Sequence, residues 1–180
     1  MALPELTTER LIVRPLTAAD EAAVAAATGQ AEPGWLEWTV AGYHQLEQLH
    51  QPPYGERAIA LRATGELVGL IGVVPSMGPF RQLPGFAGVA DGATRFRPEV
   101  GLFWALAPAH RGHGYATEAA TAVIERCFSE LNLERIVATT MHDNLASIAV
   151  MRRLGMTIAA NPLPDPPWFQ VVGWLDAPPA

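Results

Sequence analysis

One stretch, residues 99–120, constrains the fold of this chain more than any other. Its first part, residues 99–107, is almost entirely apolar, which is typical of a strand that is buried on both faces. Pro108 ends this run, and a segment with two glycines follows. Apolar residues then recur at helical spacing: Ala119, Ala120, Val123, Ile124, Cys127, Phe128 and Leu131. The sequence therefore predicts a buried strand, a glycine turn and an amphipathic helix in direct succession.

The junction between this strand and this helix has the properties of an anion-binding site. The first N–H groups of a helix have no partner within it, and the helix dipole adds about half a positive charge there. Glycines let a phosphate come close to the backbone. The lysine of a P-loop is missing, and so is the spacing of a dinucleotide-binding motif. The pattern that is present is Arg111-x-x-Gly114-x-Ala116. Because a strand, a glycine turn and a helix start in this order suit an anion, we interpret the turn as a phosphate site, with a plain connection as the alternative.

Length and composition predict one domain, residues 1–180, because 180 residues is an ordinary domain size and no repeat or linker divides the chain. No apolar stretch is as long as a membrane span, and the start lacks the pattern of a secretory signal. A single cysteine fits a reducing compartment, so we expect a cytoplasmic protein. The net charge of −6 argues against nucleic acid as a partner.

Hydrophobic periodicity and turn residues predict alternating strands and helices on both sides of the junction. Strands are expected at residues 8–15, 57–62, 66–74, 99–107, 135–141, 156–160 and 168–174, and further helices at 19–28, 39–50 and 145–154. Gly69 and Gly72 indicate a bulge or a close approach of another backbone. Residues 75–98 are rich in proline and glycine and lack periodicity, so they are predicted to be a loop, either a substrate-side flap or a tolerated insertion.

Two motifs in this order resemble those of a known family. Arg111-x-x-Gly114-x-Ala116 is similar to the pyrophosphate-binding signature of the GNAT superfamily of acyl-CoA N-acyltransferases, and residues 144–156 are similar to a second segment of that superfamily. Residues 6–11 and 114–119 resemble its Rim-type branch, the ribosomal-protein N-terminal acetyltransferases. The resemblance, from about Leu6 to Trp174, implies a GNAT fold of the α/β (mixed α+β) class. Such a fold has a twisted mixed sheet of about seven strands, flanked by helices and splayed at the core strand.

The resemblance implies acetyl-CoA as co-substrate and no metal. Backbone N–H groups of the turn would hold the diphosphate, with Arg111 nearby, and they come from Gly112, His113, Gly114, Tyr115, Ala116 and Thr117. The pantetheine amides would pair with the backbone of the core strand at Trp104, Ala105 and Leu106. Asn144 and Ser147 would lie beside the pantetheine. Arg152 or Arg153 would reach the adenosine end, with a solvated charge as the alternative.

The implied reaction is direct attack of a primary amine on the thioester in a ternary complex, so a base, an oxyanion donor and an acid for the thiolate are needed. Glu99 is the predicted base, with a solvent-exposed strand-end carboxylate as the alternative. The tyrosine that many family members use as the acid is replaced by Met151. Ser147 is therefore the predicted acid, with a hydrogen bond to the helix backbone as the alternative. The N–H of Leu106 is the predicted oxyanion donor.

The acceptor is expected to be a primary amine of a protein N-terminus or of a small molecule. A terminal amine, with a pKa of ~7.8, is roughly 10–15% neutral at pH 7, so it needs only a modest base. A homodimer would fit the Rim-type branch, and no membrane partner is expected. Two other functions stay open. One is a non-catalytic acyl-CoA-binding module, which Met151 suggests, and the other is a nucleotide or phosphate binder outside the family.

Cysteine and histidine residues receive no catalytic or metal role. Cys127 lies on the apolar stripe of the helix, so it is predicted to be a core residue rather than an acyl-carrying nucleophile. His110, His113 and His142 lack the spacing of metal ligands.

Overall fold

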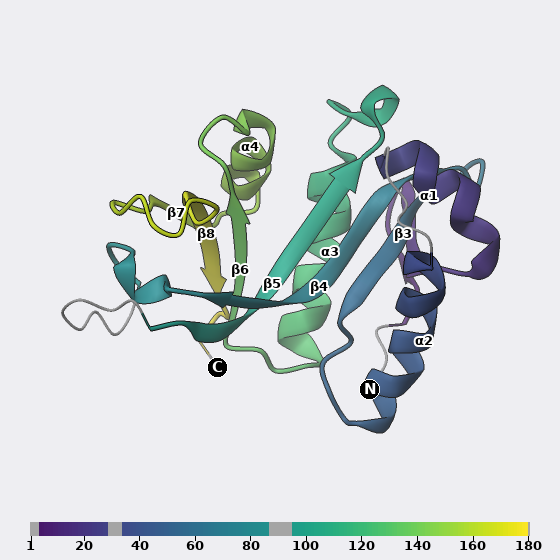
Figure 1. Cartoon of the computed structure of the whole chain (residues 1–180). Coiled ribbons are helices and arrows are strands. Elements are labelled where there is room, and N and C mark those ends of the chain that lie inside the picture. Colours follow the sequence, from purple (N-terminus) through teal and green to yellow (C-terminus); the bar gives the residue numbers. More distant parts are fainter. Residues whose placement is uncertain (1–3, 29–33, 87–94, 180) are drawn as a thin grey trace. The chain divides into compact units, whose positions relative to one another are not determined.

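The computed structural model describes residues 4–28, 34–86 and 95–179. The helices in these ranges are η1 (Ala18–Asp20), α1 (Glu21–Thr28), α2 (Trp35–Gln48), η2 (Phe80–Gln82), η3 (Pro108–His110), α3 (Tyr115–Ser129) and α4 (Leu145–Arg153). The strands are β1 (Leu6–Thr7), β2 (Leu11–Pro15), β3 (Gly55–Leu61), β4 (Leu67–Gly78), β5 (Arg97–Leu106), β6 (Arg135–Thr140), β7 (Thr157–Ala160) and β8 (Val171–Asp176). Their order in the sheet is β1-β2-β3-β4-β5-β6-β8-β7 (Figure 1). The predicted α/β class with a mixed sheet is confirmed, and the strand beyond the seven expected is β1.

The chain divides into two compact units, residues 1–74 with 102–132 and residues 75–101 with 133–180. Strands β4 and β5 each contribute residues to both units. That the whole chain is a single domain stays a prediction. No helix in the described ranges is both long enough and apolar enough to cross a membrane.

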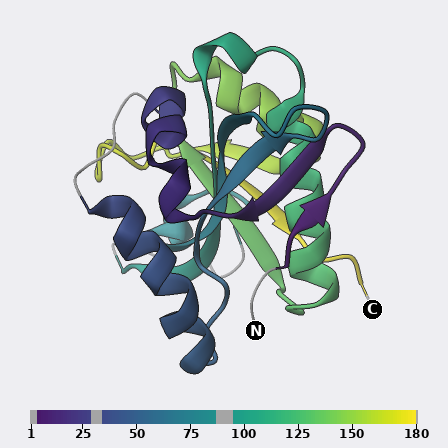
Figure 2. The same ribbon diagram turned by 90° about the vertical axis from the view of Figure 1, so that its right-hand side faces the viewer.

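The first unit combines antiparallel strands with helices on both of their faces. β2 pairs with β3, with Leu11 opposite Leu61, and β3 pairs with β4, with Gly55 opposite Val73. α1 and α2 lie over one face of these strands and α3 over the other (Figures 1 and 2). A core of buried apolar residues joins α1 and α2 to the strands: Leu16, Val24, Leu36, Ala58 and Leu70. The alternation of side chains along a strand provides one apolar face for each helical layer.

Two glycines of β4 stand where other strands come very close. A Cβ built on Gly69 would lie 2.3 Å from the carbonyl oxygen of Ala105, and one built on Gly72 would lie 2.4 Å from that of Gly55. Both distances are shorter than the contact distance of a carbon and an oxygen, so only glycine fits without a shift of the backbone. The close approach that these glycines predict is confirmed.

The second unit is built on an aromatic core. β6 and β8 are antiparallel, as are β7 and β8, while Gly101 of β5 forms a parallel bridge with Val137 of β6. The buried residues of the core come from several elements: Phe80, Leu83, Phe86, Val137, Phe169, Val172 and Trp174. The ring centroid of Phe80 lies 5.2 Å from those of both Phe86 and Phe169. Contacts between aromatic rings at this distance stabilise the core beyond simple burial.

Residues 75–86 are not the loop that the sequence predicted. β4 continues to Gly78, η2 follows, and the side chains of Phe80, Leu83 and Phe86 are at most 1% exposed. These side chains enter the core from a bent segment, so neither the strand period nor the helix period marks them. A flap is therefore excluded for residues 75–86, and residues 87–94 of the predicted loop lie outside the described part of the chain.

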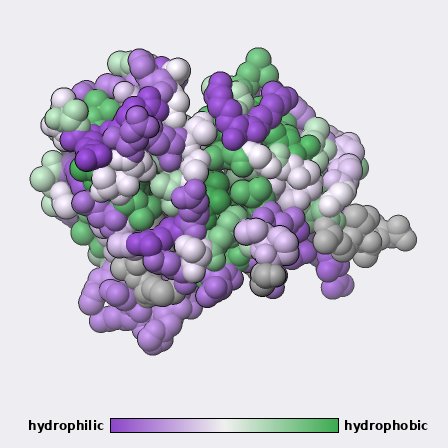
Figure 3. Space-filling view, turned by 180° about the vertical axis from the view of Figure 1, so that it is seen from behind, coloured by the Kyte–Doolittle hydropathy of each residue, from purple (hydrophilic) through white to green (hydrophobic). Residues whose placement is uncertain are grey.

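β5 is not buried on both faces along its whole length, which corrects a second prediction. Gly101 and Leu102 are buried, but Phe103 is 37% exposed and the three residues after it are half-buried. An apolar run does not by itself show that other elements cover a strand, because folded proteins keep much apolar surface in contact with water. Hydrophobic areas also interrupt the hydrophilic surface of the face shown in Figure 3.

Candidate functional site

The predicted phosphate turn joins the end of β5 to the start of α3 in the first unit. Gly112 has φ 80° and Gly114 has φ 82°, both in the left-handed region that favours glycine. Gly114 is the N-cap of α3, and since glycine has no side chain, no cap group covers the first N–H groups of the helix. The strand, turn and helix predicted from the sequence are confirmed, and the start of a 15-residue helix faces the turn.

The last residues of β5 present their backbone groups alternately to β4 and to the opposite side. The N–H of Ala107 donates to the carbonyl of Val68 (2.9 Å), and the carbonyl of Ala105 lies against Gly69. Backbone groups of neighbouring residues in a strand point in opposite directions. Those of Trp104 and Leu106 therefore point away from β4.

Arg111 connects the turn to this strand end. Its Nε donates to the carbonyl oxygen of Leu106 (3.1 Å). The carbonyl of Leu106 therefore has a protein partner, and the guanidinium lies at the point where β5 enters the turn. His110, earlier in the turn, has its Nε2 atom 3.1 Å from Oε1 of Glu66.

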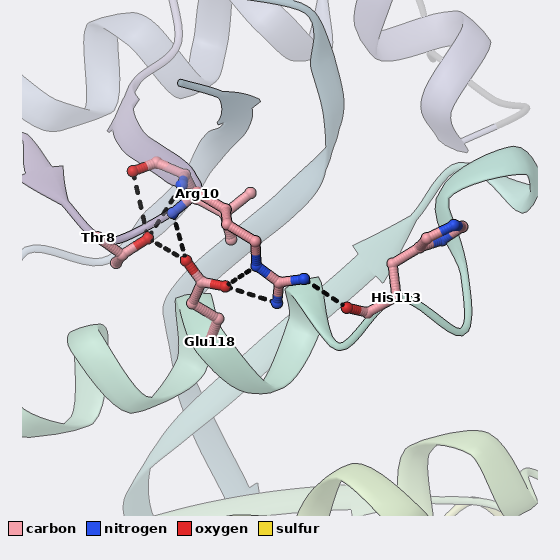
Figure 4. Close-up of polar contacts among 5 residues, drawn as sticks. Thr8, Arg10, His113 and Glu118 are labelled. Atoms are coloured by element: carbon pink, nitrogen blue, oxygen red, sulfur yellow. Dashed lines mark hydrogen bonds and ion pairs between the residues drawn. The ribbon is translucent and has the colours of Figure 1, made fainter. Parts of the chain in front are cut away.

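A polar cluster from the N-terminal segment holds the start of α3 (Figure 4). The carboxylate of Glu118 accepts hydrogen bonds from Thr8 Oγ1 (2.5 Å), from the backbone N–H of Arg10 (2.9 Å) and from Arg10 Nε (2.7 Å). Arg10 Nη2 lies 2.7 Å from the same carboxylate, and Arg10 Nη1 donates to the carbonyl of His113 (3.0 Å). Burial alone would raise the pKa of Glu118, but the hydrogen bonds from Thr8 and Arg10 outweigh it and lower the pKa.

The sequence analysis gave Thr8, Arg10 and Glu118 no role. The only local signal was an acidic residue in the first turn of a helix, where the helix dipole favours negative charge. Nothing in the spacing of Arg10 and Glu118 shows that they meet, because 108 residues separate them.

Glu99, the predicted base, lies in the second unit near the start of β5. Its side chain is 8% exposed, and the Nε of Arg97 lies 2.9 Å from its Oε1. The two groups are not aligned for a hydrogen bond, so Oε1 has no hydrogen-bond partner among the described residues. Burial raises the pKa of Glu99, and the charges of Arg97 and Arg135 reverse only part of that shift. Glu99 is therefore not the solvent-exposed strand-end carboxylate of the alternative interpretation.

The remaining predicted residues lie on α4, also in the second unit. Asn144 caps this helix as predicted, since its Oδ1 accepts the N–H of Ser147 (3.1 Å). Ser147 is half-buried and Arg152 is exposed. Met151 is fully buried, and its Sδ would lie 3.1 Å from a Cβ on Gly173. The structure thus brings the turn residues together in one unit and Asn144 and Ser147 together in the other.

The single cysteine is a core residue, as predicted. Cys127 is fully buried on α3, and burial raises its thiol pKa to about 11. A thiol with such a pKa carries almost no thiolate at neutral pH, so it does not serve as a nucleophile. Within the described ranges, no three histidine, cysteine, aspartate or glutamate side chains are grouped as metal ligands.

Comparison with known proteins gives one family. The model of the acetyltransferase (GNAT) domain matches residues 10–157. The chain is 30% identical over 162 residues to the uncharacterized N-acetyltransferase YoaA of Bacillus subtilis strain 168, a match that covers 84% of this chain and 82% of YoaA. A shorter match to YnaD of the same organism has 45% identity over 58 residues and covers 32% of this chain and 33% of YnaD. The chain therefore matches about a third of the length of YnaD.

Solved structures agree on the fold. The crystal structure of the acetyltransferase from Agrobacterium tumefaciens strain C58 has a TM-score of 0.68 and 27% identity, and the match covers 97% of this chain and 95% of that one. The ribosomal-protein-S5-alanine acetyltransferase from Vibrio fischeri has a TM-score of 0.65 and 15% identity, and the match covers 96% of each chain. At 15% identity the likeness shows the fold alone, so the Rim-type branch stays a prediction. Because the family model spans most of the sequence and these structures share the fold, the chain belongs to the GNAT acetyltransferase family.

Proposed function

We propose that this protein is an acetyl-CoA-dependent N-acetyltransferase that modifies a primary amine by direct attack in a ternary complex. The observation that carries the proposal is the turn before α3. There, two glycines with positive φ lead into a 15-residue helix whose first N–H groups have no side-chain cap. Such a helix start combines oriented N–H donors with the positive end of the helix dipole, which suits a diphosphate. The diphosphate would be held by the backbone from Gly112 to Thr117.

The backbone of β5 supports a place for the pantetheine. The groups of Trp104 and the N–H of Leu106 point away from β4. Those of Trp104 can pair with amides as an added strand would, whereas the single N–H of Leu106 is kept for the oxyanion. The groups of Ala105 point toward β4 instead, so of the three predicted residues Trp104 suits the pantetheine and Ala105 does not. The partial exposure of this strand end leaves room for such pairing.

The reaction needs one proton to leave the amine and one to reach the sulfur. The amine nitrogen forms a bond to the acetyl carbon, the carbon–sulfur bond breaks, and the products are an N-acetylated amine and coenzyme A. Glu99 accepts the amine proton, directly or through a water, because a carboxylate with a raised pKa is a better base than an exposed one. Ser147 donates to the departing thiolate, and the N–H of Leu106 stabilises the oxyanion.

The acceptor is a primary amine, either the N-terminus of a protein or an amine of a small molecule, and the reaction takes place in the cytoplasm. A terminal amine is favoured because its pKa of ~7.8 leaves part of it neutral at pH 7, so Glu99 needs to be only a modest base. A Rim-type role, with a ribosomal protein as acceptor, is one form of this proposal. A homodimer is proposed as the assembly that fits this role.

A non-catalytic acyl-CoA-binding module is the second candidate, and one observation favours it. Met151 occupies the position at which many family members carry a tyrosine, and it is fully buried. A thioether has no proton to donate, so Met151 cannot protonate a thiolate. If Ser147 does not replace the tyrosine, the chain binds acyl-CoA without turnover.

Release of thiol from acetyl-CoA in the presence of a panel of amines separates the two candidates. The panel includes peptides with free N-termini, lysine-containing peptides with blocked N-termini, amino acids and polyamines. An enzyme releases thiol with at least one amine, and that amine gains the mass of one acetyl group. Binding of acetyl-CoA without release over the whole panel would favour the binding module, and no binding by calorimetry would remove both.

The Gly114→Glu variant tests the turn itself. A side chain at φ 82° strains the backbone, and its carboxylate would repel the diphosphate and lie near Nη2 of Arg10, which is 3.5 Å from a Cβ at this position. Coenzyme A binding should be lost. The matched control is Gly65→Glu, which is equally strained at φ 76° but lies in the β3–β4 turn, and it should bind coenzyme A as the wild type does.

A further inference from the structure

Arg10 lies in the first unit and has no role in the proposed function. All three nitrogens of its guanidinium nevertheless contact other groups of the protein. Nε and Nη2 contact the carboxylate of Glu118, each at 2.7 Å, and Nη1 donates to the carbonyl of His113 at 3.0 Å. These contacts use one N–H of each nitrogen and hold the plane of the guanidinium in place. Its hydrogen bond to the turn is made to backbone, at the carbonyl of His113.

The bond to His113 fixes the orientation of one peptide group. In a planar trans peptide, the carbonyl and the N–H of the next residue point in opposite directions. The carbonyl of His113 points toward Arg10, so the N–H of Gly114 points away from Arg10. The next carbonyl, that of Gly114, is also fixed, because it accepts the N–H of Glu118 (3.0 Å) as the first bond of α3.

The orientation matters because glycine does not hold it alone. With no Cβ, Gly112 and Gly114 reach many backbone conformations, so the peptide groups between them can rotate at little cost. A turn that must present its N–H groups in one direction therefore needs an outside contact. Arg10 is such a contact, and it comes from the segment that leads into β2 rather than from the turn.

Arg10 is itself held in place. The Oε1 atom of Glu118 accepts hydrogen bonds from Thr8 Oγ1 and from the backbone N–H of Arg10. Its Oε2 atom accepts a hydrogen bond from the guanidinium of Arg10 (Figure 4). The guanidinium also lies 4.8 Å from the ring centroid of Tyr115, and that ring stacks on His113 at 5.5 Å. Arg10 thus contacts the turn and the first turn of α3 together, with a planar fork that a lysine cannot imitate.

We propose that Arg10, oriented by Glu118 and Thr8, is a positioning residue for the diphosphate of coenzyme A: it sets the His113–Gly114 peptide so that the N–H of Gly114 faces the ligand. This inference rests on the proposed coenzyme A site. It assigns a binding role to the N-terminal segment, which lies far from the turn in the sequence.

The test compares Arg10→Gln, Arg10→Lys and Arg14→Gln. Arg14 is the matched control, because it forms an equally close pair with Asp20, with Nη1 and Nη2 at 2.8 and 2.7 Å from the two carboxylate oxygens, and it does not contact the turn. Each variant is studied by thermal unfolding, by calorimetric titration with coenzyme A and with pantetheine, and by steady-state kinetics with the amine that the panel identifies.

We expect Arg10→Gln to weaken coenzyme A binding about 10-fold, as the loss of a charge-assisted hydrogen bond would. The KM for acetyl-CoA should rise by a similar factor while kcat changes little, and pantetheine, which has no diphosphate, should bind as before. Arg14→Gln should lose stability but keep the affinity. Arg10→Lys should recover stability without recovering the affinity, since lysine keeps the charge but not the fork.

Three results would overturn the inference. Unchanged coenzyme A affinity in Arg10→Gln would show that the turn holds its shape without Arg10. Full affinity in Arg10→Lys would show that the positive charge acts directly, and an equal loss in Arg14→Gln would show a general effect of stability. In each case the wild type still binds coenzyme A and the proposed function stands, whereas a wild type that does not bind coenzyme A refutes both.

Discussion

The surroundings of Glu99 change the acid–base chemistry of one carboxyl group. Its carboxyl is 8% exposed, its Oε1 lacks a hydrogen bond, and burial raises its pKa despite the charges of Arg97 and Arg135. A carboxyl in these surroundings holds its proton more strongly than an exposed one, and that is what proton transfer near neutral pH requires. Sequence position alone suggested Glu99, but only its surroundings distinguish it from an ordinary surface carboxylate.

Glu99→Gln should reduce turnover about 100-fold if Glu99 is the base. The ratio of wild-type to variant rate should be greatest between the raised pKa of Glu99 and the amine pKa of ~7.8. Below that window the wild-type carboxyl is protonated and loses its advantage, and above it the amine arrives neutral. Rates measured across pH check this, with the exposed Glu125→Gln as control. A ratio that does not change with pH would leave Glu99 a structural residue.

Asp20 is a second residue whose surroundings set its chemistry, here for stability. Its carboxylate accepts hydrogen bonds from both Nη atoms of Arg14 and from the backbone N–H and the Oγ1 hydroxyl of Thr17. Arg14 is the main reason that its pKa falls from 3.8 to about 2. Since the folded-state pKa is the lower one, the stabilisation is complete above pH 3.8 and is lost as the pH falls through 2.

Asp20→Asn should therefore lower the free energy of unfolding at pH 7 by about 1–2 kcal/mol. The difference from the wild type should shrink below pH 4 and vanish only below pH 2, where the wild-type carboxyl is protonated as well. Urea unfolding at several pH values measures this. Asp143→Asn, at an exposed position, is the control. A constant difference across pH would mean that Asp20 acts through packing and not through its charge.

At the scale of elements, the strand, turn and helix around Gly114 and the capped helix α4 could be predicted because their signals are local. Gly112 and Gly114 need left-handed backbone, Asn144 caps α4 through Ser147, and Gly155 ends it with φ 75°. Helix ends and glycine turns are decided by neighbours in the sequence, which a reader of the sequence can see.

The rest could not be predicted, because it depends on residues that are distant in the sequence. Residues 75–86 have no period, yet Phe80 and Phe86 fill a core with Phe169. The pair of Arg10 and Glu118 exists only because the chain brings the segment before β2 against α3. The exposure of Phe103 in β5 likewise depends on which elements cover the strand. The apolar neighbours of Phe103 in the sequence do not reveal this.

The approach of β5 to β4 gives a prediction at this scale. Gly69→Ala should lower stability by about 1–3 kcal/mol, because its Cβ would lie 2.3 Å from the carbonyl of Ala105 and the backbone must shift. Gly42→Ala is the matched control. It lies inside α2 with nothing within 4 Å of its Cβ, so it should stabilise by about 0.5–1 kcal/mol. Thermal unfolding measures both, and equal effects would contradict the close approach.

For the whole molecule, family membership fixes the class of reaction but not the acceptor. The groups that we propose for the diphosphate and the pantetheine are mostly backbone groups, and backbone geometry is what a fold retains when its sequence changes. The acceptor is chosen by side chains instead. Over most of its length this chain is at most 30% identical to the relatives above, so most of its side chains differ from theirs. Acceptor screening therefore has to precede any assignment to the Rim-type branch.

Cys127 offers a reporter for the stability of the first unit and for its ligand. It is the single cysteine of the chain, it is fully buried on α3, and its thiol pKa of about 11 suppresses the reactive thiolate. Alkylation by N-ethylmaleimide therefore requires that α3 leaves the core. The rate of labelling, followed by mass spectrometry, measures the population of opened molecules when reclosing is fast.

Acetyl-CoA, whose sulfur is blocked, should slow this labelling by the factor 1 + [ligand]/Kd, which is about 100-fold at a concentration of 100 Kd, or ~2.7 kcal/mol. The reason is linkage: a ligand that binds the turn at the start of α3 stabilises every state in which that helix is docked. Arg10→Gln, with a weaker Kd, should be protected less at the same concentration. Labelling that stays slow but does not respond to acetyl-CoA would place the ligand away from α3, and it would contradict the site on which the proposed function depends.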